Sequence, residues 1–378
     1  MRVLTLTPFY PSATDDGQGC FVAEPLRATE SLGVKNLVIA VQPFYRDKTQ
    51  PNPAGPNASW IRYFSLPGNW GLSTAGAFLF ARVLRLVKKM HAERRIDLIH
   101  AHAPLPAGHA AALLSRELGI PFVVSVHGLD AFSLEQVPGP AGKWCARVSR
   151  MVYSSAKRVI CVSNRVREEV EKGVSAANTI VVYNGVDVSM FTPGEVSPDQ
   201  TILSVGNLIP IKGHGVLIRA FAGIAAKFPA SKVKIIGTGP EEGNLHSLAG
   251  ELGVEARVTF AGRQSRKQVA DALRMCSIFA LPSRYEGLGC VYLEAMATEK
   301  PVIPCRGQGI EEIIQNGKNG ILVEPGNVQQ LSFALTALLE NAGLRQQIGA
   351  AARRTVLQGF TLNDQAQQLV AVYEDCLR

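Results

Sequence analysis

Short apolar runs recur along the whole chain with helix-forming segments between them, and this alternation restricts the fold most. Nearly continuous apolar runs are typical of strands buried on both faces, as in parallel sheets covered by helices. Helical candidates between the runs include Ala77–Met90, Val216–Lys227 and Gln329–Glu340. The pattern predicts an α/β fold with doubly wound parallel sheets. The predicted strands are Val3–Thr7, Leu37–Val41, Leu98–Ala101, Phe122–Val126, Val159–Val162, Ile180–Tyr183, Ile202–Val205, Val233–Ile236, Val258–Phe260, Ile278–Leu281, Val302–Pro304 and Ile321–Val323.

A polar, proline-punctuated segment, residues 193–200, divides the predicted strands into two groups. Such a segment is typical of a linker between domains. With 378 residues the chain is long enough for each domain to bury its own core. We place the first domain at residues 1–195 and the second at residues 196–361. The last segment, residues 362–378, has the pattern of an amphipathic helix.

Two glutamates lie on one predicted strand–turn–helix unit. The apolar run that ends at Leu281 leads into a glycine-bearing turn that contains Glu286, and Glu294 lies inside the helix that starts near Cys290. A carboxylate matches two adjacent sugar hydroxyls, and a helix N-terminus offers unpaired N–H groups to a phosphate. Two diol-binding groups with a phosphate site between them fit a nucleotide-sugar.

This unit resembles the Glu-x7-Glu signature of family 4 retaining glycosyltransferases, which have two Rossmann-like domains facing each other across a cleft (the GT-B fold). The resemblance covers nearly the whole chain, and Phe9–Pro11 and Gly19–Val22 are similar to polysaccharide-assembly members such as teichuronic acid enzymes. It implies that Glu286 contacts the transferred sugar and Glu294 the ribose. The turn residues between them would line the donor site; these are Gly287, Leu288 and Gly289. The final helix would pack back on the first domain.

A second loop resembles the phosphate loop of this family. In Gly206–Gly213, Lys212 would act as a point charge on the diphosphate and stabilise the leaving group. The family pattern has an arginine where this chain has Asn207. Either Arg284 or Arg263 substitutes for it, or the site holds diphosphate more weakly.

Glycine-rich turns follow two other predicted strands. Gly237 opens a loop that lines the nucleotide pocket in the resembled family, although Glu241 and Glu242 oppose a dinucleotide site there. Near the start of the chain, Gly17 and Gly19 let the backbone approach a diphosphate closely, and either could be the contact.

Histidines stand at the ends of strands in the first half. His127 begins a His-Gly-Leu-Asp motif that resembles the family's histidine motif near the donor sugar, and Asp130 ends it on the acceptor side. His100 and His102 flank Ala101, so both side chains can lie on one face of their strand. We assign His100 a structural role and expect His102 on the acceptor side. Ligands of open α/β sheets bind at the carboxyl ends of the strands, which predicts a cleft there.

The sequence has no Asp-x-Asp motif and no cluster of His, Asp and Glu with metal-ligand spacing. We therefore expect a metal-independent transfer without a cofactor, in which cationic side chains and helix dipoles neutralise the diphosphate.

Composition bears on location and partners. Seven scattered cysteines, none in a Cys-x-x-Cys pair, favour a reducing cytoplasm. We expect no signal peptide and no spanning helix. The net charge of +8 lies mostly in the first half, where basic and apolar residues interleave over Phe78–Arg95 and again around Lys143–Arg150. A basic amphipathic helix can lie on an anionic membrane, so we expect peripheral attachment to the inner face of the cytoplasmic membrane, where lipid-linked glycan acceptors reside.

The expected function is a retaining glycosyltransferase that moves a hexose from a UDP- or GDP-linked donor to a hydroxyl of a glycan or glycolipid in cell-surface polysaccharide assembly. Three alternatives remain. A nucleotide-sugar epimerase on the same fold would form product without an acceptor. A glycoside hydrolase would use the carboxylate pair but not the phosphate loops. A nucleic-acid-binding protein would suit the pI near 9.2, but no binding motif is present. Neither the sugar, the acceptor nor the oligomeric state follows from the sequence.

Overall fold

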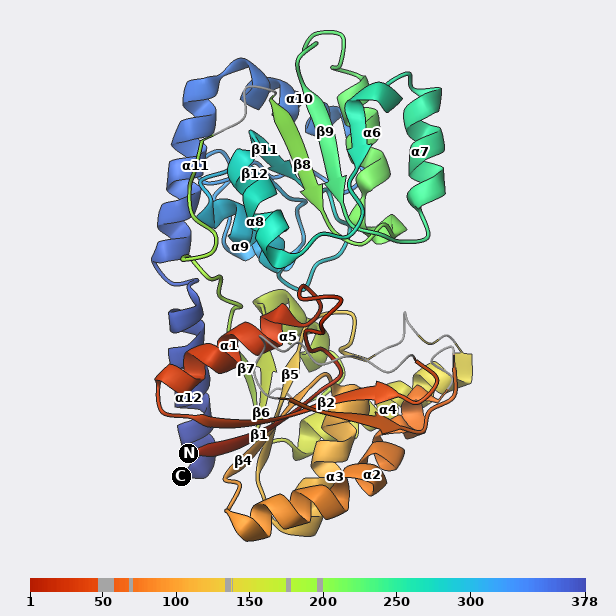
Figure 1. Ribbon diagram of the computed structural model, residues 1–378, viewed down its shortest axis with the longest axis vertical. Coiled ribbons are helices and arrows are strands. Elements are labelled where there is room, and N and C mark those ends of the chain that lie inside the picture. The colour runs from red at the N-terminus through yellow and green to blue at the C-terminus, as the bar shows by residue number, and fades with distance from the viewer. Residues whose placement is uncertain (47–57, 68–70, 133–136, 138, 175–177, 196–199) are drawn as a thin grey trace. The chain divides into compact units, whose positions relative to one another are not determined.

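The computed structural model describes residues 1–46, 58–67, 71–132, 137, 139–174, 178–195 and 200–378. The chain divides into two compact units, unit 1 (residues 1–184 and 362–378) and unit 2 (residues 185–361). Each unit is an α/β layer structure with a parallel sheet between helices (Figure 1).

Unit 1 contains a parallel sheet of seven described strands in the order β3-β2-β1-β4-β5-β6-β7. The central strands β4 and β5 are buried at every residue, including His100, His102 and Ser125 within their mostly apolar sequences. The strands are β1 (Arg2–Thr7), β2 (Lys35–Pro43), β3 (Ala58–Tyr63), β4 (Leu98–His102), β5 (Phe122–Val126), β6 (Arg158–Cys161) and β7 (Thr179–Val181). The helices are α1 (Cys20–Ser31), α2 (Leu72–Glu93), α3 (His109–Leu118), α4 (Gly139–Ser155), α5 (Asn164–Glu171) and α12 (Leu362–Leu377), with a short helical turn η1 (Pro104–Gly108).

Unit 2 contains a parallel sheet of five described strands in the order β10-β9-β8-β11-β12. Its apolar core joins the strands to α6, α7 and α10, with buried Phe221 and Leu335 among its members. The strands are β8 (Thr201–Val205), β9 (Lys232–Ile236), β10 (Val258–Phe260), β11 (Ile278–Ala280) and β12 (Val302–Ile303). The helices are α6 (His214–Ala222), α7 (Glu242–Glu251), α8 (Arg266–Met275), α9 (Cys290–Ala297), α10 (Val328–Glu340) and α11 (Ala342–Leu357), with short turns η2 (Pro210–Lys212), η3 (Glu255–Arg257) and η4 (Gly309–Glu312).

The predicted α/β fold with two doubly wound parallel sheets is confirmed, and two strand assignments differ. Strand β3 was not predicted, because it lies at the sheet edge and its sequence mixes Trp60 and Ile61 with exposed polar residues. The predicted strand Ile321–Val323 runs beside β12, with Ile321 N donating to Val302 O and Val323 N to Pro304 O, but it forms an isolated bridge at Val323 rather than a strand.

The boundary between the units falls at Asn184, earlier than the expected position after residue 195. The segment that follows Asn184 packs on unit 2: Val186 N donates to Phe360 O at 3.0 Å, and Phe191 is fully buried. Residues 196–199 of the predicted linker lie outside the described residues. Helix α12 belongs to unit 1, where the Tyr373 hydroxyl lies 2.7 Å from His100 Nδ1.

Both sheets reverse their strand order at one point. In unit 1 the reversal lies between β1 and β4, and in unit 2 between β8 and β11. Loops diverge there, so the carboxyl ends of these strand pairs form a natural crevice for ligands. The segments after β8 and β11 carry Lys212 and Glu286, and those after β1 and β4 carry Phe9 and Ala103.

Candidate functional site

In unit 2, the two loops at the reversal bring a cation and a carboxylate into contact. Lys212 Nζ donates to Glu286 Oε1 at 2.6 Å. Lys212 ends the turn η2 after β8, and Glu286 follows β11. Their side chains are 21% and 10% exposed, so the pair is largely shielded from water without being sealed. Both residues were predicted in loops that follow strands, and the structure brings them together.

Glu286 is fixed by a second set of hydrogen bonds. Ser283 Oγ donates to Glu286 Oε1 at 2.9 Å, and Glu286 N donates to the side-chain oxygen of Gln308 at 2.9 Å. Gln308 is itself held through its amide nitrogen, which donates to Arg284 O at 2.9 Å. A carboxylate held by backbone and side chain is preorganised for a ligand on its remaining side.

Glu294 lies on α9 and pairs with a residue that the sequence analysis did not select. Arg266 Nη1 donates to Glu294 Oε1 at 2.5 Å, and both side chains are about one-tenth exposed or less. The Arg266 guanidinium also lies 4.9 Å from the ring centroid of Phe191. Arg266 begins helix α8, whose capping box of Ser265 and Gln268 is readable from the sequence; its pairing with Glu294 is not.

Glycines allow the loops of this site to touch backbone to backbone. Gly213 has φ +74°, and a Cβ there would lie 2.1 Å from Pro282 O. Gly237 has φ +146°, and a Cβ there would lie 2.0 Å from Gly206 O. Only glycine fits these positions, so each has a packing reason besides any contact with a ligand. Gly289 precedes helix α9 with φ +83° and turns the chain into it after Gly287 and Leu288.

The two candidate substitutes for the family arginine lie on different loops. Asn207 is exposed. Arg263 Nη2 approaches Thr238 Oγ1 at 3.5 Å, beside the Gly237 loop. Arg284 N donates to Ile211 O at 2.8 Å, next to Lys212, and its side chain lines a pocket of about 490 Å³ with Gly213 and Glu241.

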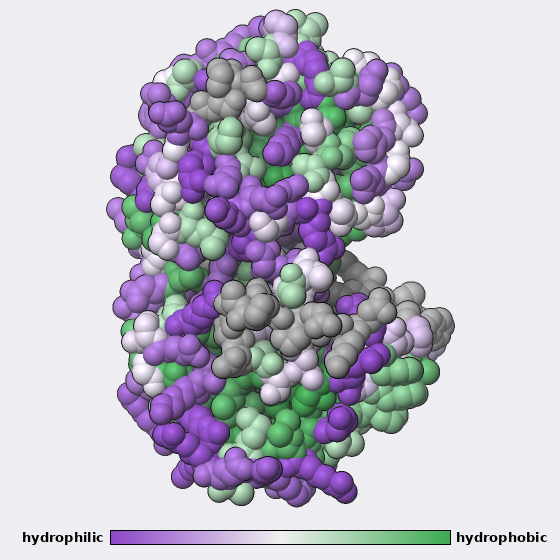
Figure 2. All heavy atoms as spheres, viewed as in Figure 1, coloured by the Kyte–Doolittle hydropathy of each residue, from purple (hydrophilic) through white to green (hydrophobic). Residues whose placement is uncertain are grey.

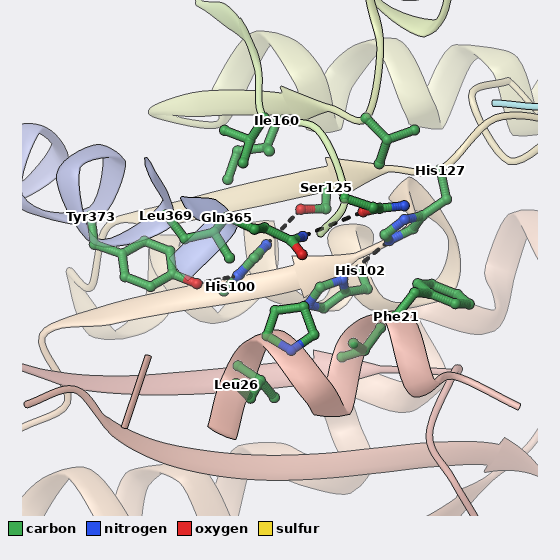
Figure 3. Close-up of a pocket in the computed structure, with 15 residues that line it drawn as sticks. Phe21, Leu26, His100, His102, Ser125, His127, Ile160, Gln365, Leu369 and Tyr373 are labelled. Carbon is green, nitrogen blue, oxygen red and sulfur yellow. Dashed lines mark hydrogen bonds between the residues drawn. The ribbon is translucent and has the colours of Figure 1, made fainter. Parts of the chain in front are cut away.

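In unit 1, three histidines lie in a row behind the carboxyl ends of β4 and β5 (Figure 3). His102 Nδ1 lies 3.1 Å from His127 Nε2, and the rings of His100 and His102 stack with centroids 4.3 Å apart. His100 is held between the Tyr373 hydroxyl and Ser125 Oγ, each at 2.7 Å. The histidines border a cavity of about 20 Å³, large enough for one water molecule. His100 therefore packs against His102, and His102 in turn contacts His127.

Burial keeps these histidines neutral. Desolvation lowers the pKa of His100 to about 3 and that of His127 to about 4. It lowers the pKa of His102 well below its usual value, helped by the neighbouring rings. In unit 2, burial lowers the pKa of His214 to about 4; its Nδ1 lies 3.2 Å from Ser204 Oγ.

Asp130 borders a second pocket in unit 1. This pocket of about 350 Å³ lies at the carboxyl ends of β1 to β4, and its walls are rich in aromatic side chains. Asp130 Oδ1 accepts from His127 N at 3.0 Å, whereas Oδ2 is buried without a hydrogen-bond partner among the described residues. Desolvation raises the Asp130 pKa to about 6. The pocket lining includes Phe9, Tyr10, Gln18, Gln42, Tyr45, Arg46, Trp60, Tyr63, Ser65 and Asp130, and His102 lies outside it.

Of the two glycines before helix α1, only Gly19 occupies a position that excludes other residues. Gly19 has φ +75° at the start of α1, and a Cβ there would lie 2.4 Å from Tyr10 N. At Gly17 a Cβ would meet only Asp15 Oδ1, at 3.5 Å. Gly19 is therefore needed for packing of the first loop, and Gly17 N donates to Asp15 Oδ1 at 3.2 Å. Within the described residues no three His, Cys, Asp or Glu side chains are grouped to hold a metal ion.

Comparison with known proteins identifies the family. Residues 16–190 match the family model described as Glycosyltransferase Family 4, and residues 187–355 match the one described as Glycosyl transferases group 1. An uncharacterized glycosyltransferase of Methanocaldococcus jannaschii is 33% identical over 67% of this chain and 68% of its own length. The chain belongs to the family 4 glycosyltransferases.

Two further comparisons extend over the whole of this glycosyltransferase. TuaC of Bacillus subtilis, which is named for teichuronic acid biosynthesis, is 25% identical over 99% of this chain and 98% of its own. Anabaena HepE, solved in complex with UDP and glucose, superimposes with a TM-score of 0.77 at 24% identity and covers 99% of both chains. This likeness confirms the GT-B fold of the glycosyltransferase.

The buried histidines predict an acid-sensitive glycosyltransferase. An unfolded histidine takes up a proton below about pH 6.5, whereas folded His100 does so only near pH 3, so its contribution to stability is full above pH 6.5 and falls on acidification. We expect His100 alone to lower the free energy of unfolding by about 1 kcal/mol between pH 7.5 and 5.5. Urea unfolding of wild type and His100→Gln at both pH values tests this, with exposed His246→Gln as control. An equal pH response of wild type and His100→Gln would contradict it.

Proposed function

We propose that this glycosyltransferase is a retaining enzyme that moves a hexose from a UDP- or GDP-linked donor to a hydroxyl of a glycan or glycolipid acceptor in cell-surface polysaccharide assembly. The observation that carries the donor site is the contact between Lys212 and Glu286 at the strand-order reversal of unit 2. A diphosphate needs a cation, and a hexose needs a hydrogen-bond acceptor; here the two groups are 2.6 Å apart on loops that glycines hold together.

Lys212 would turn from Glu286 to the donor diphosphate. Negative charge grows on the diphosphate as the bond from the sugar C1 to the phosphate oxygen breaks, and a positioned ammonium group stabilises it. The first N–H groups of α9, after Gly289, would add a helix N-terminus on the same anion. Arg263, beside the Gly237 loop, would supply part of the charge that Asn207 lacks. Because Lys212 supplies positive charge to the diphosphate, we expect the transfer to need no metal ion.

Glu286 would orient the transferred sugar. In a same-face displacement the acceptor oxygen bonds to C1 from the side that the diphosphate leaves, and the acceptor proton passes to the departing diphosphate. Released from Lys212, Glu286 would accept hydrogen bonds from sugar hydroxyls, with Ser283 and Gln308 holding it in place. Glu294 would bind the ribose, steadied by Arg266. His127 would meet the sugar through Nδ1, which is buried without a partner among the described residues.

The pocket beside Asp130 would take the acceptor. Aromatic walls pack against the C–H faces of pyranose rings, while Gln18, Gln42 and Asp130 offer polar groups to hydroxyls. Known relatives support a sugar-transfer chemistry with different acceptors: TuaC is named for teichuronic acid, and a Streptomyces kanamyceticus relative is an α-D-kanosaminyltransferase. The UDP and glucose bound to HepE support the nucleotide-sugar donor.

Calorimetric titration with UDP, GDP and their hexose conjugates tests the donor assignment. We expect one of the two nucleotide series to bind, with affinity unchanged by EDTA. The anomeric configuration of the product, followed by NMR during turnover, tests retention. Absence of heat with every nucleotide-sugar would end the proposal, and product formation without acceptor would favour an epimerase.

The Asp130 carboxylate predicts a pH dependence of acceptor use. Above pH 6 the ionised carboxylate accepts a hydrogen bond from an acceptor hydroxyl, and below it the protonated form does so less well, because burial raises its pKa to about 6. We expect the acceptor KM of wild type to rise below pH 6, and that of Asp130→Asn to be about tenfold higher at pH 7.5 and flat with pH. An unchanged KM in this variant would remove Asp130 from the acceptor site. Donor KM serves as the internal control.

A further inference from the structure

Three phenylalanine rings from separate segments form an exposed cluster on unit 1. Phe44 follows β2, Phe64 follows β3, and Phe78 lies in helix α2. The rings of Phe44 and Phe64 stack with centroids 5.4 Å apart, and those of Phe64 and Phe78 meet edge to face at 5.0 Å. Their exposed fractions are 45%, 49% and 45%, and nearby Leu66 is 53% exposed. We call these four residues the aromatic surface.

The aromatic surface is built into the fold. Phe44 N donates to Tyr63 O at 2.9 Å, so the ends of β2 and β3 hold Phe44 and Phe64 next to each other. Single exposed apolar side chains are common, but a contiguous exposed apolar patch is typical of a site where a membrane or another protein binds. Figure 2 shows apolar side chains gathered over a face of unit 1. Because about half of each ring is exposed to water, burying the cluster against an apolar partner would lower the free energy.

Exposed basic side chains flank the aromatic surface. Arg82 and Arg85 follow Phe78 at the four- and seven-residue spacing that places side chains on one face of a helix, and both are exposed. Helix α2 contains no Asp or Glu before Glu93, and neither arginine pairs with a described acidic residue. Arg46 and Arg62 are exposed beside the strand ends. These four arginines make the described part of the flank positive.

We propose that the aromatic surface and this basic flank dock unit 1 on an anionic lipid bilayer. Phenylalanine and leucine side chains insert at the boundary of headgroups and acyl chains, while arginines attract anionic headgroups. Phe78–Arg95 and the region around Lys143–Arg150 were expected to make this contact; the structure adds the ends of β2 and β3, which carry Phe44 and Phe64. No helix in the described part of the chain is long and apolar enough to cross a membrane.

The bilayer surface adjoins the pocket assigned to the acceptor. Tyr45 and Arg46 directly follow Phe44, and Tyr63 and Ser65 flank Phe64, and all four line that pocket. Docking through Phe44 and Phe64 therefore brings the pocket wall to the headgroup level. This deepens the proposed function and rests on it for one point only: the glycan acceptor is held on a lipid.

Co-sedimentation with lipid vesicles tests the docking without donor or acceptor. Vesicles of phosphatidylcholine alone are compared with vesicles that contain 30% phosphatidylglycerol, at about 0.1 M salt. We expect the purified protein to bind the anionic vesicles at least tenfold more tightly. The triple variant Phe44→Ser, Phe64→Ser, Phe78→Ser should lose binding, and Arg82→Glu with Arg85→Glu should lose the preference for anionic lipid. Phe333→Ser and Arg354→Glu, exposed residues of unit 2, are the matched controls.

Nucleotide binding by each variant shows that it is folded, and transfer to a water-soluble acceptor separates docking from catalysis. Loss of vesicle binding with retained transfer supports the proposal. Wild type that transfers sugar but binds no anionic vesicle overturns it and leaves the enzyme assignment standing. Wild type that forms a dimer, which the triple variant abolishes without any effect of lipid, also overturns it and makes the surface a contact between two copies. A protein without transfer that still docks on vesicles would instead count against the proposed function.

Discussion

Replacing Lys212 with methionine is expected to lower the turnover number about 100- to 1,000-fold, because the departing diphosphate loses the ammonium group that neutralises it. Methionine keeps an unbranched, flexible side chain that is one atom shorter, and it removes the charge. Donor affinity should change less than turnover, since charge on the diphosphate grows as the sugar leaves. Steady-state kinetics with saturating donor and acceptor, together with donor titration by calorimetry, measure both quantities.

Lys227 offers a matched control for Lys212 in the same unit. It pairs with Glu340 and its side chain is 59% exposed. Lys227→Met should therefore leave turnover unchanged. A normal turnover number in Lys212→Met would remove the lysine from catalysis and leave it only as the partner of Glu286.

Changing Glu294 is expected to weaken both nucleotide binding and the fold. Glu294→Gln should raise the dissociation constant of the nucleotide by about 10- to 100-fold, which corresponds to roughly 1.5–3 kcal/mol for a lost charged hydrogen bond. The change also breaks the buried ion pair between Glu294 and Arg266, so the free energy of unfolding should fall by about 3–5 kcal/mol. Calorimetric titration and chemical denaturation report the two effects separately.

A double variant distinguishes the two roles of Glu294. In Arg266→Met, Glu294→Met both charges are gone, and an apolar pair of similar volume should restore most of the lost stability. Nucleotide binding should stay weak in this variant. If nucleotide binding returned together with stability, Glu294 would be structural and the ribose contact would have to be assigned elsewhere.

The fold could be predicted from the sequence because central parallel strands are recognisable as mostly apolar runs. Strands β4 and β5 are buried at every residue and were found for that reason. Strand β3 was missed because an edge strand is half exposed, so its composition resembles that of a loop. Ile321–Val323 has the composition of a strand and its backbone bonds to Val302 and Pro304, but composition does not show that the pairing is limited to one isolated bridge.

The candidate site was predictable where sheet topology alone brings residues together. Lys212 and Glu286 each follow a strand, and neighbouring parallel strands end at one edge, so their contact follows from the strand order. The contact between Arg266 and Glu294 depends on how α8 and α9 pack, which no local pattern encodes. Asp130 was predicted as a site residue, but the aromatic wall of its pocket was missed for a similar reason: Tyr45, Trp60 and Tyr63 come from β2, β3 and their ends, and β3 was not predicted.

Unit 1 is assembled from two pieces of chain, and this has a consequence for how the protein is made. Helix α12 supplies Tyr373 to His100 and covers part of the first apolar core, yet it leaves the ribosome only after all of unit 2. Until then, residues 1–184 lack the helix that covers part of their core. Unit 2 is a continuous segment whose two ends are joined by the hydrogen bond from Val186 to Phe360, so it can fold by itself. Unit 1 can therefore be completed only after the whole of unit 2 has been synthesised.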